Sequence, residues 1–265
     1  MTDLPGFGDN FMALEALIFD VDGTLADTER DGHRVAFNQA FAEVGLDWRW
    51  DVELYGQLLA VTGGKERIRY YVDQYRQDYV KPADFEALVV RLHAAKTRHY
   101  TALLGQGGIP LRPGVRRLLE EARARGVRLA IATTTTPDNV SALLRHAVSP
   151  EAILWFEVIG AGDVVAAKKP APDIYYYVLN QLRLSPAQCM AFEDSENGLR
   201  AAQAAGLKTV ITVNDYTRAH DFHGAAMVID HLGEPSRPFQ GLSGYDVNGA
   251  CCLDLKLLEQ LQADA

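Results

Sequence analysis

The sequence predicts an α/β protein: a doubly wound (Rossmann-like) parallel sheet that carries an inserted all-helical cap domain. From residue 111 onward, short apolar runs alternate with segments of helical periodicity. This alternation is typical of a parallel sheet with helices on both faces. An earlier apolar run, at residues 16–19, is followed by a long stretch, 28–105, in which no convincing strand appears. The second observation places the helical insert directly after the first strand.

The elements follow in order from periodicity and from capping or turn residues. The first strand is expected at 14–20, and helices at 28–43, 54–59, 66–79 and 83–104. The core then resumes with helix 115–125, strand 127–132, helix 137–146, strand 156–160, helix 172–182 and strand 188–192. Ser195 caps a helix that ends at Gly206, and strands at 208–213 and 227–230 complete the sheet.

The domain boundaries follow from this order. We expect a core of residues 12–27 plus 106–235, and a helical cap at 28–105. Residues 1–12 are expected to form a loose arm. The tail from Gly233 is rich in Gly and Pro, so 236–265 is expected to be a C-terminal extension with one short helix at 253–261.

Composition excludes several classes of partner. The chain of 265 residues has 35 acidic and 26 basic residues, a formal charge of −9. This balance disfavours nucleic acid or an anionic membrane as the main partner. No apolar run approaches the ~18 residues of a membrane span, and the N-terminus lacks a signal-peptide pattern. The three cysteines show no metal-binding spacing. We therefore expect a cytoplasmic, monomeric enzyme that acts on a small molecule.

Polar residues stand where the core strands end. Asp20 and Asp22 follow the first strand, and Gly23 permits the bend that aims both at one site. Thr133 and Thr134 follow the second strand. The remaining polar residues are Lys169 in a loop and the pair Glu193-Asp194 after a later strand. The carboxyl ends of parallel strands meet at one crevice.

This inventory suits phosphoryl transfer. Asp20, Asp22 and Asp194 would repel one another without a divalent cation, and oxygen ligands favour Mg²⁺. We interpret Asp20 as the nucleophile and Asp22 as the acid and base for the leaving group and the water. Lys169, Thr133 and backbone N–H groups near Thr134 would hold the phosphoryl oxygens.

Each motif by itself has a structural alternative. An Asp-x-Asp-Gly run is often a turn, threonines often border a strand, and Lys-Lys-Pro is usually solvated. Glu193-Asp194-Ser195 could simply begin a helix, where acidic residues are favoured. All four motifs occur in order, each at or shortly after a strand end, and together they favour the catalytic interpretation.

With these motifs the chain resembles the haloacid dehalogenase superfamily of phosphatases and phosphomutases. Residues 20–24 (Asp-Val-Asp-Gly-Thr), Thr133, Lys169 and Glu193-Asp194 match its four motifs. The resemblance implies an aspartyl-phosphate on Asp20, with Asp22 as acid and base. It also implies Mg²⁺ held by Asp20, the Asp22 main chain and Asp194, with Glu193 orienting a metal-bound water. Finally, it implies that the helical cap at 28–105 closes over the crevice and determines substrate selectivity.

Further stretches narrow the resemblance. Residues 169–173 (Lys-Pro-Ala-Pro-Asp) and 193–195 are similar to the β-phosphoglucomutase-like branch. Residues 36–38, 62–67 and 132–136 resemble the CbbY-type proteins of that branch. That resemblance implies a phosphatase for xylulose 1,5-bisphosphate, a misfire product that inhibits Rubisco in the Calvin cycle.

Several cap residues are candidates for binding the sugar phosphate. Gly63 and Gly64 offer backbone N–H groups, and Lys65 and Arg67 add two cations, which would suit the second phosphate of a bisphosphate. The alternative is a helix–helix turn with solvated basic residues. Glu29 and His33 are also candidates, although family members often carry this histidine one residue earlier.

Other functions remain open at this level. A sugar phosphomutase would use the same residues, and a phosphoglycolate-type phosphatase would need no second basic clamp. A non-enzymatic phospho-receiver has no need of a helical cap, and a metal-free dehalogenase would not gather Asp22 and Asp194 around Asp20.

Overall fold

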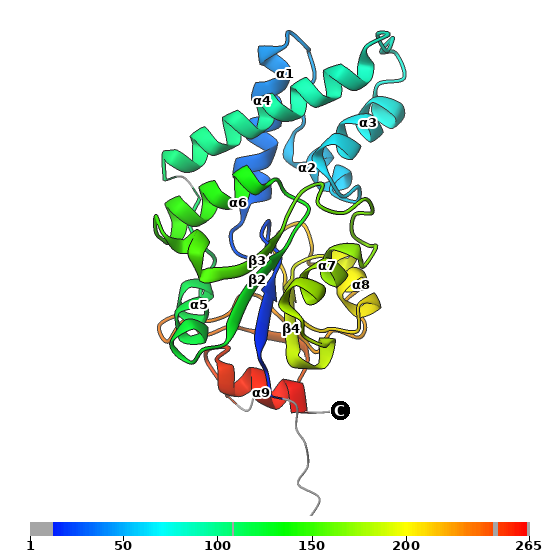
Figure 1. Cartoon of the computed structure of the whole chain (residues 1–265). Helices are drawn as coiled ribbons and strands as arrows, with labels where there is room; N and C mark the ends of the chain where they lie inside the picture. The colour runs from blue at the N-terminus through cyan, green and yellow to red at the C-terminus, as the bar shows by residue number, and fades with distance from the viewer. Residues whose placement is uncertain (1–12, 108, 246–248, 264–265) are drawn as a thin grey trace, which may run out of the picture.

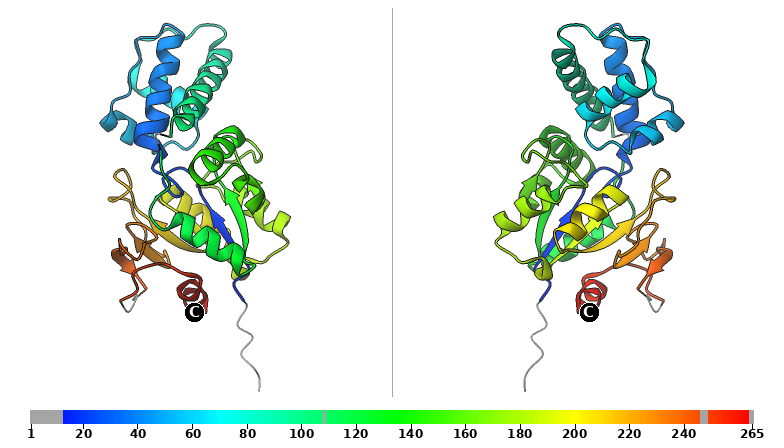
Figure 2. Two further views of the ribbon diagram at one scale, coloured as in Figure 1. Left: turned by 90° about the vertical axis from the view of Figure 1, so that its left-hand side faces the viewer. Right: turned by 90° about the vertical axis from the view of Figure 1, so that its right-hand side faces the viewer.

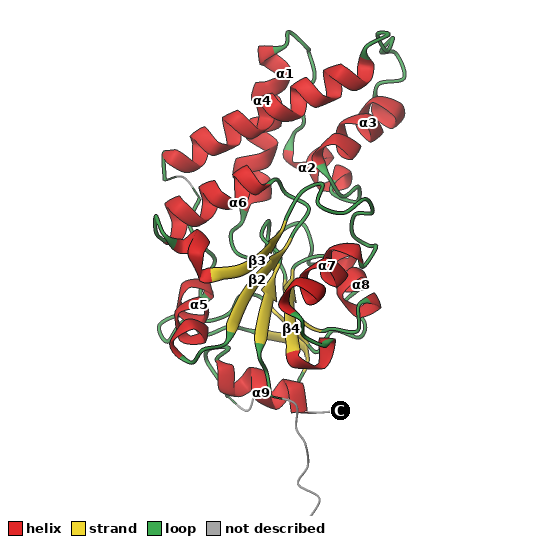
Figure 3. Ribbon diagram, viewed as in Figure 1, coloured by secondary structure: helices red, strands yellow, loops and turns green. Residues whose placement is uncertain are grey.

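The computed structural model describes residues 13–107, 109–245 and 249–263, so the arm expected at residues 1–12 lies outside the described residues. Within these residues the chain forms a seven-stranded sheet in the order β3-β2-β1-β4-β5-β6-β7 (Figures 1 and 3). The strands are β1 (Ala16–Phe19), β2 (Arg128–Ala132), β3 (Phe156–Gly160), β4 (Cys189–Glu193), β5 (Lys208–Thr212), β6 (Met227–Ile229) and β7 (Gly241–Gly244).

The sheet confirms the predicted fold class. Across the sheet, β3, β2, β1, β4, β5 and β6 each pair in parallel with the next strand, so β1 lies between β2 and β4. Phe19 is aligned with Ile131 on one side and with Phe192 on the other. Because the three strands end at the same edge, the residues that follow them gather there.

The edge strand β7 was not predicted from the sequence. It pairs antiparallel with β6, and all four of its residues are exposed. With a glycine at each end and no buried side chain it shows no apolar alternation, which is the signal for a half-buried strand. Backbone pairing with β6 is what orders it.

Helices cover both faces of the sheet. One face packs against α5 (Val115–Ala124), α6 (Pro137–Leu143) and α9 (Leu255–Ala263), and the other against α7 (Asp173–Leu182) and α8 (Glu196–Ala204). Side chains alternate accordingly, since Leu17 and Phe19 face the first layer and Ala16 and Ile18 the second. The leucines of α9 belong to the main apolar cluster, so this helix packs against the core.

The remaining helices stand above the carboxyl edge of the sheet (Figures 1 and 2). They are α1 (Arg34–Glu43), α2 (Val52–Leu58), α3 (Gly64–Tyr75) and α4 (Phe85–Gly105). They enclose a separate apolar cluster in which Trp50 contacts Phe37, Phe41 and Tyr55. Short helical turns complete the chain: η1 (Glu29–His33), η2 (Leu144–Val148), η3 (Ala152–Trp155) and η4 (Pro186–Gln188).

Two of these turns interrupt helices that the sequence predicts as continuous. The helix expected at 28–43 begins with the π-helical turn η1, and the helix expected at 137–146 ends in the π-helical turn η2. A π-helical turn accommodates one extra residue, which periodicity at 3.6 residues per turn does not register.

Two linkers join the helical unit to the sheet and run side by side. Ala26 and Leu111 form an antiparallel bridge, and Arg112 N donates to Leu25 O at 2.9 Å. The buried Arg112 side chain also donates to the main-chain carbonyls of Gly23, Thr212, Val213 and Asp230. This guanidinium ties the turn after Asp22 to the ends of β5 and β6.

No described helix combines the length and the apolar character that crossing a membrane requires.

Candidate active site

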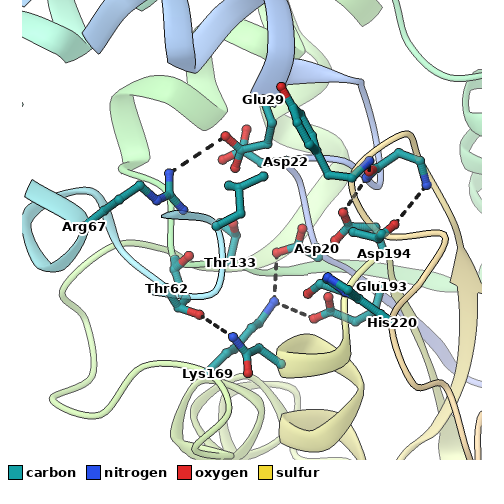
Figure 4. Close-up of a pocket in the computed structure, with 17 residues that line it drawn as sticks. Asp20, Asp22, Glu29, Thr62, Arg67, Thr133, Lys169, Glu193, Asp194 and His220 are labelled. Atoms are coloured by element: carbon teal, nitrogen blue, oxygen red, sulfur yellow. Dashed lines mark hydrogen bonds and ion pairs between the residues drawn. The ribbon is translucent and has the colours of Figure 1, made fainter. Parts of the chain in front are cut away.

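A pocket lies at the carboxyl edge of the sheet, beneath α2 and α3 (Figure 4). Its core wall includes Asp20, Asp22, Thr133, Thr134, Lys169, Glu193 and Asp194, and its cap wall includes Glu29, Thr62 and Arg67. The structure thus brings together the polar residues that the sequence places at separate strand ends.

Lys169 connects Asp20 to Glu193. Its Nζ donates to Asp20 Oδ1 at 2.8 Å, to Glu193 Oε1 at 2.5 Å and to Ala132 O at 2.8 Å. Glu193 also accepts a hydrogen bond from the Tyr175 hydroxyl. Burial alone would lower the pKa of Lys169, but Asp20 and Glu193 raise it above its ordinary value. The ammonium is therefore held charged beside Asp20.

The buried carboxylates carry more negative charge than Lys169 balances. Oxygens of Asp20, Glu193 and Asp194 lie within 4.8 Å of one another, and all three residues are buried. Burial raises the pKa of Asp20 to about 7, against the lowering effect of Lys169. Burial, together with Asp20 and Glu193, also raises the pKa of Asp194 well above its usual range. An all-oxygen, electron-rich cluster of this kind fits a hard divalent cation.

The Asp22 carboxylate contacts the cap side of the pocket. Its Oδ1 accepts from Thr28 Oγ1 at 2.6 Å and lies 2.7 Å from His33 Nε2. Burial would raise the pKa of Asp22, but His33 and Thr28 lower it below its ordinary value. Asp20 and Asp22 therefore have different partners although only one residue separates them.

The two threonines that follow β2 line the pocket. The Thr133 backbone N–H donates to Gly160 O at 2.9 Å, and its hydroxyl accepts from Thr135 N at 3.3 Å. Thr136 caps α6, since its side chain accepts from Asn139 N. The capping fixes the loop in which Thr133 and Thr134 lie.

On the cap wall, Arg67, Tyr55 and Glu29 form one connected cluster. Arg67 Nη1 donates to the Tyr55 hydroxyl at 2.9 Å and lies 4.0 Å from Glu29 Oε2, while Tyr55 itself donates to Glu29. Arg67 Nε donates to Leu58 O at 3.2 Å, and only 7% of the residue is exposed. A buried guanidinium thus lines the pocket on the cap side, whereas Lys169 lines it on the core side (Figure 4).

The other cap candidates occupy a different place. Gly63, Gly64 and Lys65 line a neighbouring pocket, and Lys65 forms an ion pair with Asp163. Lys65 and Arg67 are two residues apart on α3, and residues at that spacing do not share a helix face. In this structure only Arg67 of the two faces the pocket that contains Asp20.

Sequence reasoning missed several lining residues. Asn214 Nδ2 donates to Asp194 Oδ2 at 2.6 Å, and Asn197 Nδ2 donates to Thr62 Oγ1 at 3.2 Å. Asn214 and Tyr216 lie in the loop after β5, and this loop follows a strand end like the other motifs. That position is the signal that could have identified them.

Comparisons with known proteins agree with this geometry. A family model described as a hydrolase, haloacid dehalogenase-like hydrolase, matches residues 14–206. The chain belongs to this family. Relatives within the family carry names of phosphatases, and the chain is a phosphatase of this family.

Three relatives illustrate the similarity. The chain is 50% identical to the protein CbbY (plasmid) of Cupriavidus necator over 225 residues, which cover 85% of this chain and 88% of the relative. It is 31% identical to the phosphorylated carbohydrates phosphatase of Thermotoga maritima over 200 residues, covering 76% and 85%. An Asp-to-Asn variant of CbbY from Rhodobacter sphaeroides, solved with xylulose 1,5-bisphosphate, is 46% identical with a TM-score of 0.78, covering 84% of this chain and 98% of that chain.

Proposed function

We propose that this haloacid dehalogenase-like phosphatase hydrolyses a sugar bisphosphate, xylulose 1,5-bisphosphate, and so removes an inhibitor of Rubisco. The observation that carries the proposal is the pair of cations on opposite walls of one pocket, Lys169 beside Asp20 and Arg67 on the cap. A substrate with two phosphates needs positive charge at both ends. The CbbY relative solved with this bisphosphate supports the same choice of substrate.

A magnesium ion is part of this proposal. Asp20, the main chain of Asp22 and Asp194 would hold it, with Glu193 orienting a bound water, and the acidic cluster fits such an ion. When bound, the ion supplies positive charge that screens the carboxylates from the substrate phosphate.

The reaction follows from the residues around Asp20. The Asp20 carboxylate attacks phosphorus, the bond to the sugar oxygen breaks, and an aspartyl-phosphate forms. Asp22 must be protonated when the bond to the sugar oxygen breaks, although His33 and Thr28 favour its ionised form. It then gives this proton to the leaving alkoxide, and it later takes a proton from the water that hydrolyses the aspartyl-phosphate. Lys169, the Thr133 hydroxyl and backbone N–H groups near Thr134 bind the phosphoryl oxygens throughout. Phosphate and a free Asp20 are left.

The helices at 28–105 serve in this proposal as a cap that selects the sugar. Arg67, Tyr55 and Glu29 come from this segment, whereas the groups that perform the chemistry come from the core. We further propose that the enzyme acts as a monomer in the cytoplasm, consistent with its acidic composition.

A hydrolysis screen tests the proposal. Initial rates would be compared for xylulose 1,5-bisphosphate, the two xylulose monophosphates, hexose monophosphates and 2-phosphoglycolate. We expect the highest kcat/KM for the bisphosphate, stoichiometric release of inorganic phosphate, and loss of turnover with EDTA that Mg²⁺ restores. Isomerised sugar phosphate without phosphate release would instead identify a mutase. A preference for 2-phosphoglycolate would reject the bisphosphate assignment.

A further inference from the structure

Tyr216 lines the pocket and carries a polar atom that has no hydrogen-bond partner among the described residues. It lies in the loop after β5, and its hydroxyl is buried without a hydrogen-bond partner. Among the described residues that line this pocket, it is the only one with such an orphaned side-chain atom. Leaving a buried hydroxyl unpaired costs about 1–3 kcal/mol. A bound ligand that pairs with the hydroxyl would recover this cost.

The core holds Tyr216 through a residue of the acidic cluster. The Tyr216 backbone N–H donates to Asn214 Oδ1 at 2.9 Å, and the same Asn214 side chain donates to Asp194 Oδ2 at 2.6 Å. The Asn214 backbone N–H donates in turn to Thr217 Oγ1 at 3.0 Å. These hydrogen bonds fix the loop relative to Asp194, and they therefore fix the backbone position from which the Tyr216 side chain extends.

The Tyr216 ring packs against the cap. It meets the ring of Tyr55 edge-on with 6.2 Å between centroids. A Cβ added to Gly56 would lie 3.1 and 3.3 Å from atoms of the Tyr216 ring, which is closer than ordinary contact. Glycine at 56 lets α2 approach the ring. Tyr216 thus stands where the core meets the Arg67–Tyr55–Glu29 cluster.

We propose that Tyr216 is a further specificity-determining residue, whose hydroxyl donates a hydrogen bond to an oxygen of the bound phosphorylated sugar beside Tyr55. The inference rests on the proposed function, and assigns part of the sugar recognition to the core rather than to the cap. Burial raises the pKa of Tyr216, so the phenol keeps its proton and acts as a donor at neutral pH.

The test is binding to an inactive background. Calorimetric titrations with Mg²⁺ present would compare Asp20→Asn with Asp20→Asn/Tyr216→Phe, using xylulose 1,5-bisphosphate and 2-phosphoglycolate. Tyr216→Phe removes only the hydroxyl, so Kd for the bisphosphate should rise about 2- to 13-fold, the range for one lost hydrogen bond. Kd for 2-phosphoglycolate, which has no sugar, should change less than about twofold on the same reasoning.

Tyr176→Phe is the matched control. Tyr176 lies on α7, away from the pocket, and its hydroxyl donates to Ala204 O at the end of α8, so its loss should leave both Kd values unchanged. Gly56→Ala in the same background probes the cap contact. The added methyl displaces the Tyr216 ring, so the bisphosphate should again bind more weakly while 2-phosphoglycolate does not.

Two results would overturn the inference. Unchanged binding of the bisphosphate by the Tyr216→Phe variant would mean that the hydroxyl meets no substrate atom. Equal weakening for both ligands would mean that Tyr216 supports the phosphate and metal end of the pocket instead. Failure of the proposed function itself would be seen in a different measurement, the hydrolysis screen, in which the wild-type enzyme would release no phosphate from the bisphosphate.

Discussion

His33 Nε2 lies 2.7 Å from Asp22 Oδ1, so a side chain at the base of the cap contacts the carboxylate assigned as acid and base. The contact depends on the π-helical turn η1 (Glu29–His33), which takes up one residue more than an α-helical turn would. His33 stands one residue later in the sequence than the histidine of many family members. The extra residue in the π-helical turn brings its side chain to the core side of the helix, next to Asp22. The tilted ring of Tyr100, 4.0 Å away between centroids, packs against its face.

Replacing His33 should slow the chemical step. Among the described residues, Thr28 and His33 are the side chains that hold the Asp22 carboxylate, and only Thr28 remains in His33→Ala. The carboxylate then loses its fixed orientation, so kcat should fall about tenfold, because small misplacements of reacting groups are costly. KM should change little, since the phosphate-binding groups are untouched. The control is His99→Ala, which removes a surface contact of the same length, 2.7 Å to Glu43 Oε2. Equal rates in the two variants would contradict an orienting role for His33.

Asp20→Asn should abolish turnover without unfolding the protein. The amide cannot act as the nucleophile, yet it has nearly the same shape and can still accept a hydrogen bond from Lys169. The measurements are phosphate release and the thermal unfolding midpoint. Activity within about tenfold of the wild type would remove Asp20 from the nucleophile role, because loss of a nucleophile costs far more than that.

Asp22→Asn should lower kcat by about 10²–10⁴, the usual contribution of a general acid or base. Single-turnover experiments would follow formation and hydrolysis of the aspartyl-phosphate separately. Both steps should slow, because Asp22 is assigned a proton transfer in each. A variant that accumulates aspartyl-phosphate at the wild-type rate would limit Asp22 to the second step.

The sequence predicted most of the pocket residues that perform the chemistry, but fewer of the residues that surround them. Asp20, Thr133, Lys169 and Asp194 were identifiable because each stands at or near a strand end, and parallel strands bring their carboxyl ends together. Asn214 and Tyr216 also follow a strand, but a run of Asn, Asp, Tyr and Thr is equally typical of a surface turn.

The cap was harder to predict for a geometrical reason. A cluster of basic residues in the sequence does not reveal which helix face each one occupies, so Lys65 and Arg67 were grouped although they face different pockets. The contact of His33 with Asp22 depends on a π-helical turn, and the hydrophobic periodicity of the sequence does not predict such a turn. Strand β7 depended on pairing with β6 rather than on its own residues.

Gly23→Ala should damage the acidic cluster specifically. Gly23 has a φ of +86°, and an added Cβ would overlap the Asp194 carboxylate. We expect weaker Mg²⁺ binding, with the half-saturating Mg²⁺ concentration for activity raised at least about tenfold, in addition to the ~1 kcal/mol strain of a left-handed alanine. The control is Gly45→Ala, with a similar φ of +80° and no atom within 4 Å of the new methyl. Both variants should lose stability from backbone strain, Gly23→Ala more because of the overlap with Asp194, and only Gly23→Ala should raise the half-saturating Mg²⁺ concentration.

Arg67→Ala should discriminate between substrates. Loss of the buried guanidinium should raise KM for xylulose 1,5-bisphosphate by about tenfold or more, since charge-assisted hydrogen bonds are worth about 1.5–3 kcal/mol. KM for 2-phosphoglycolate should change far less. Arg69→Ala is the control on the same helix, because Arg69 pairs with Glu86 on the surface. Equal effects of Arg67→Ala on the two substrates would argue that Arg67 only supports the cap fold.

The bridge between Ala26 and Leu111 has a consequence for how such an enzyme can change over time. Because the chain leaves and re-enters the sheet at adjacent points, everything between those points can lengthen, shorten or be replaced without altering the order of the strands. The entropy of closing such an excursion grows only slowly with its length. Selection can therefore alter the segment between residues 26 and 111 while the strand ends that carry Asp20, Thr133 and Asp194 stay in place. Exchange of the intervening segment between relatives is the natural route by which one catalytic sheet acquires new substrates.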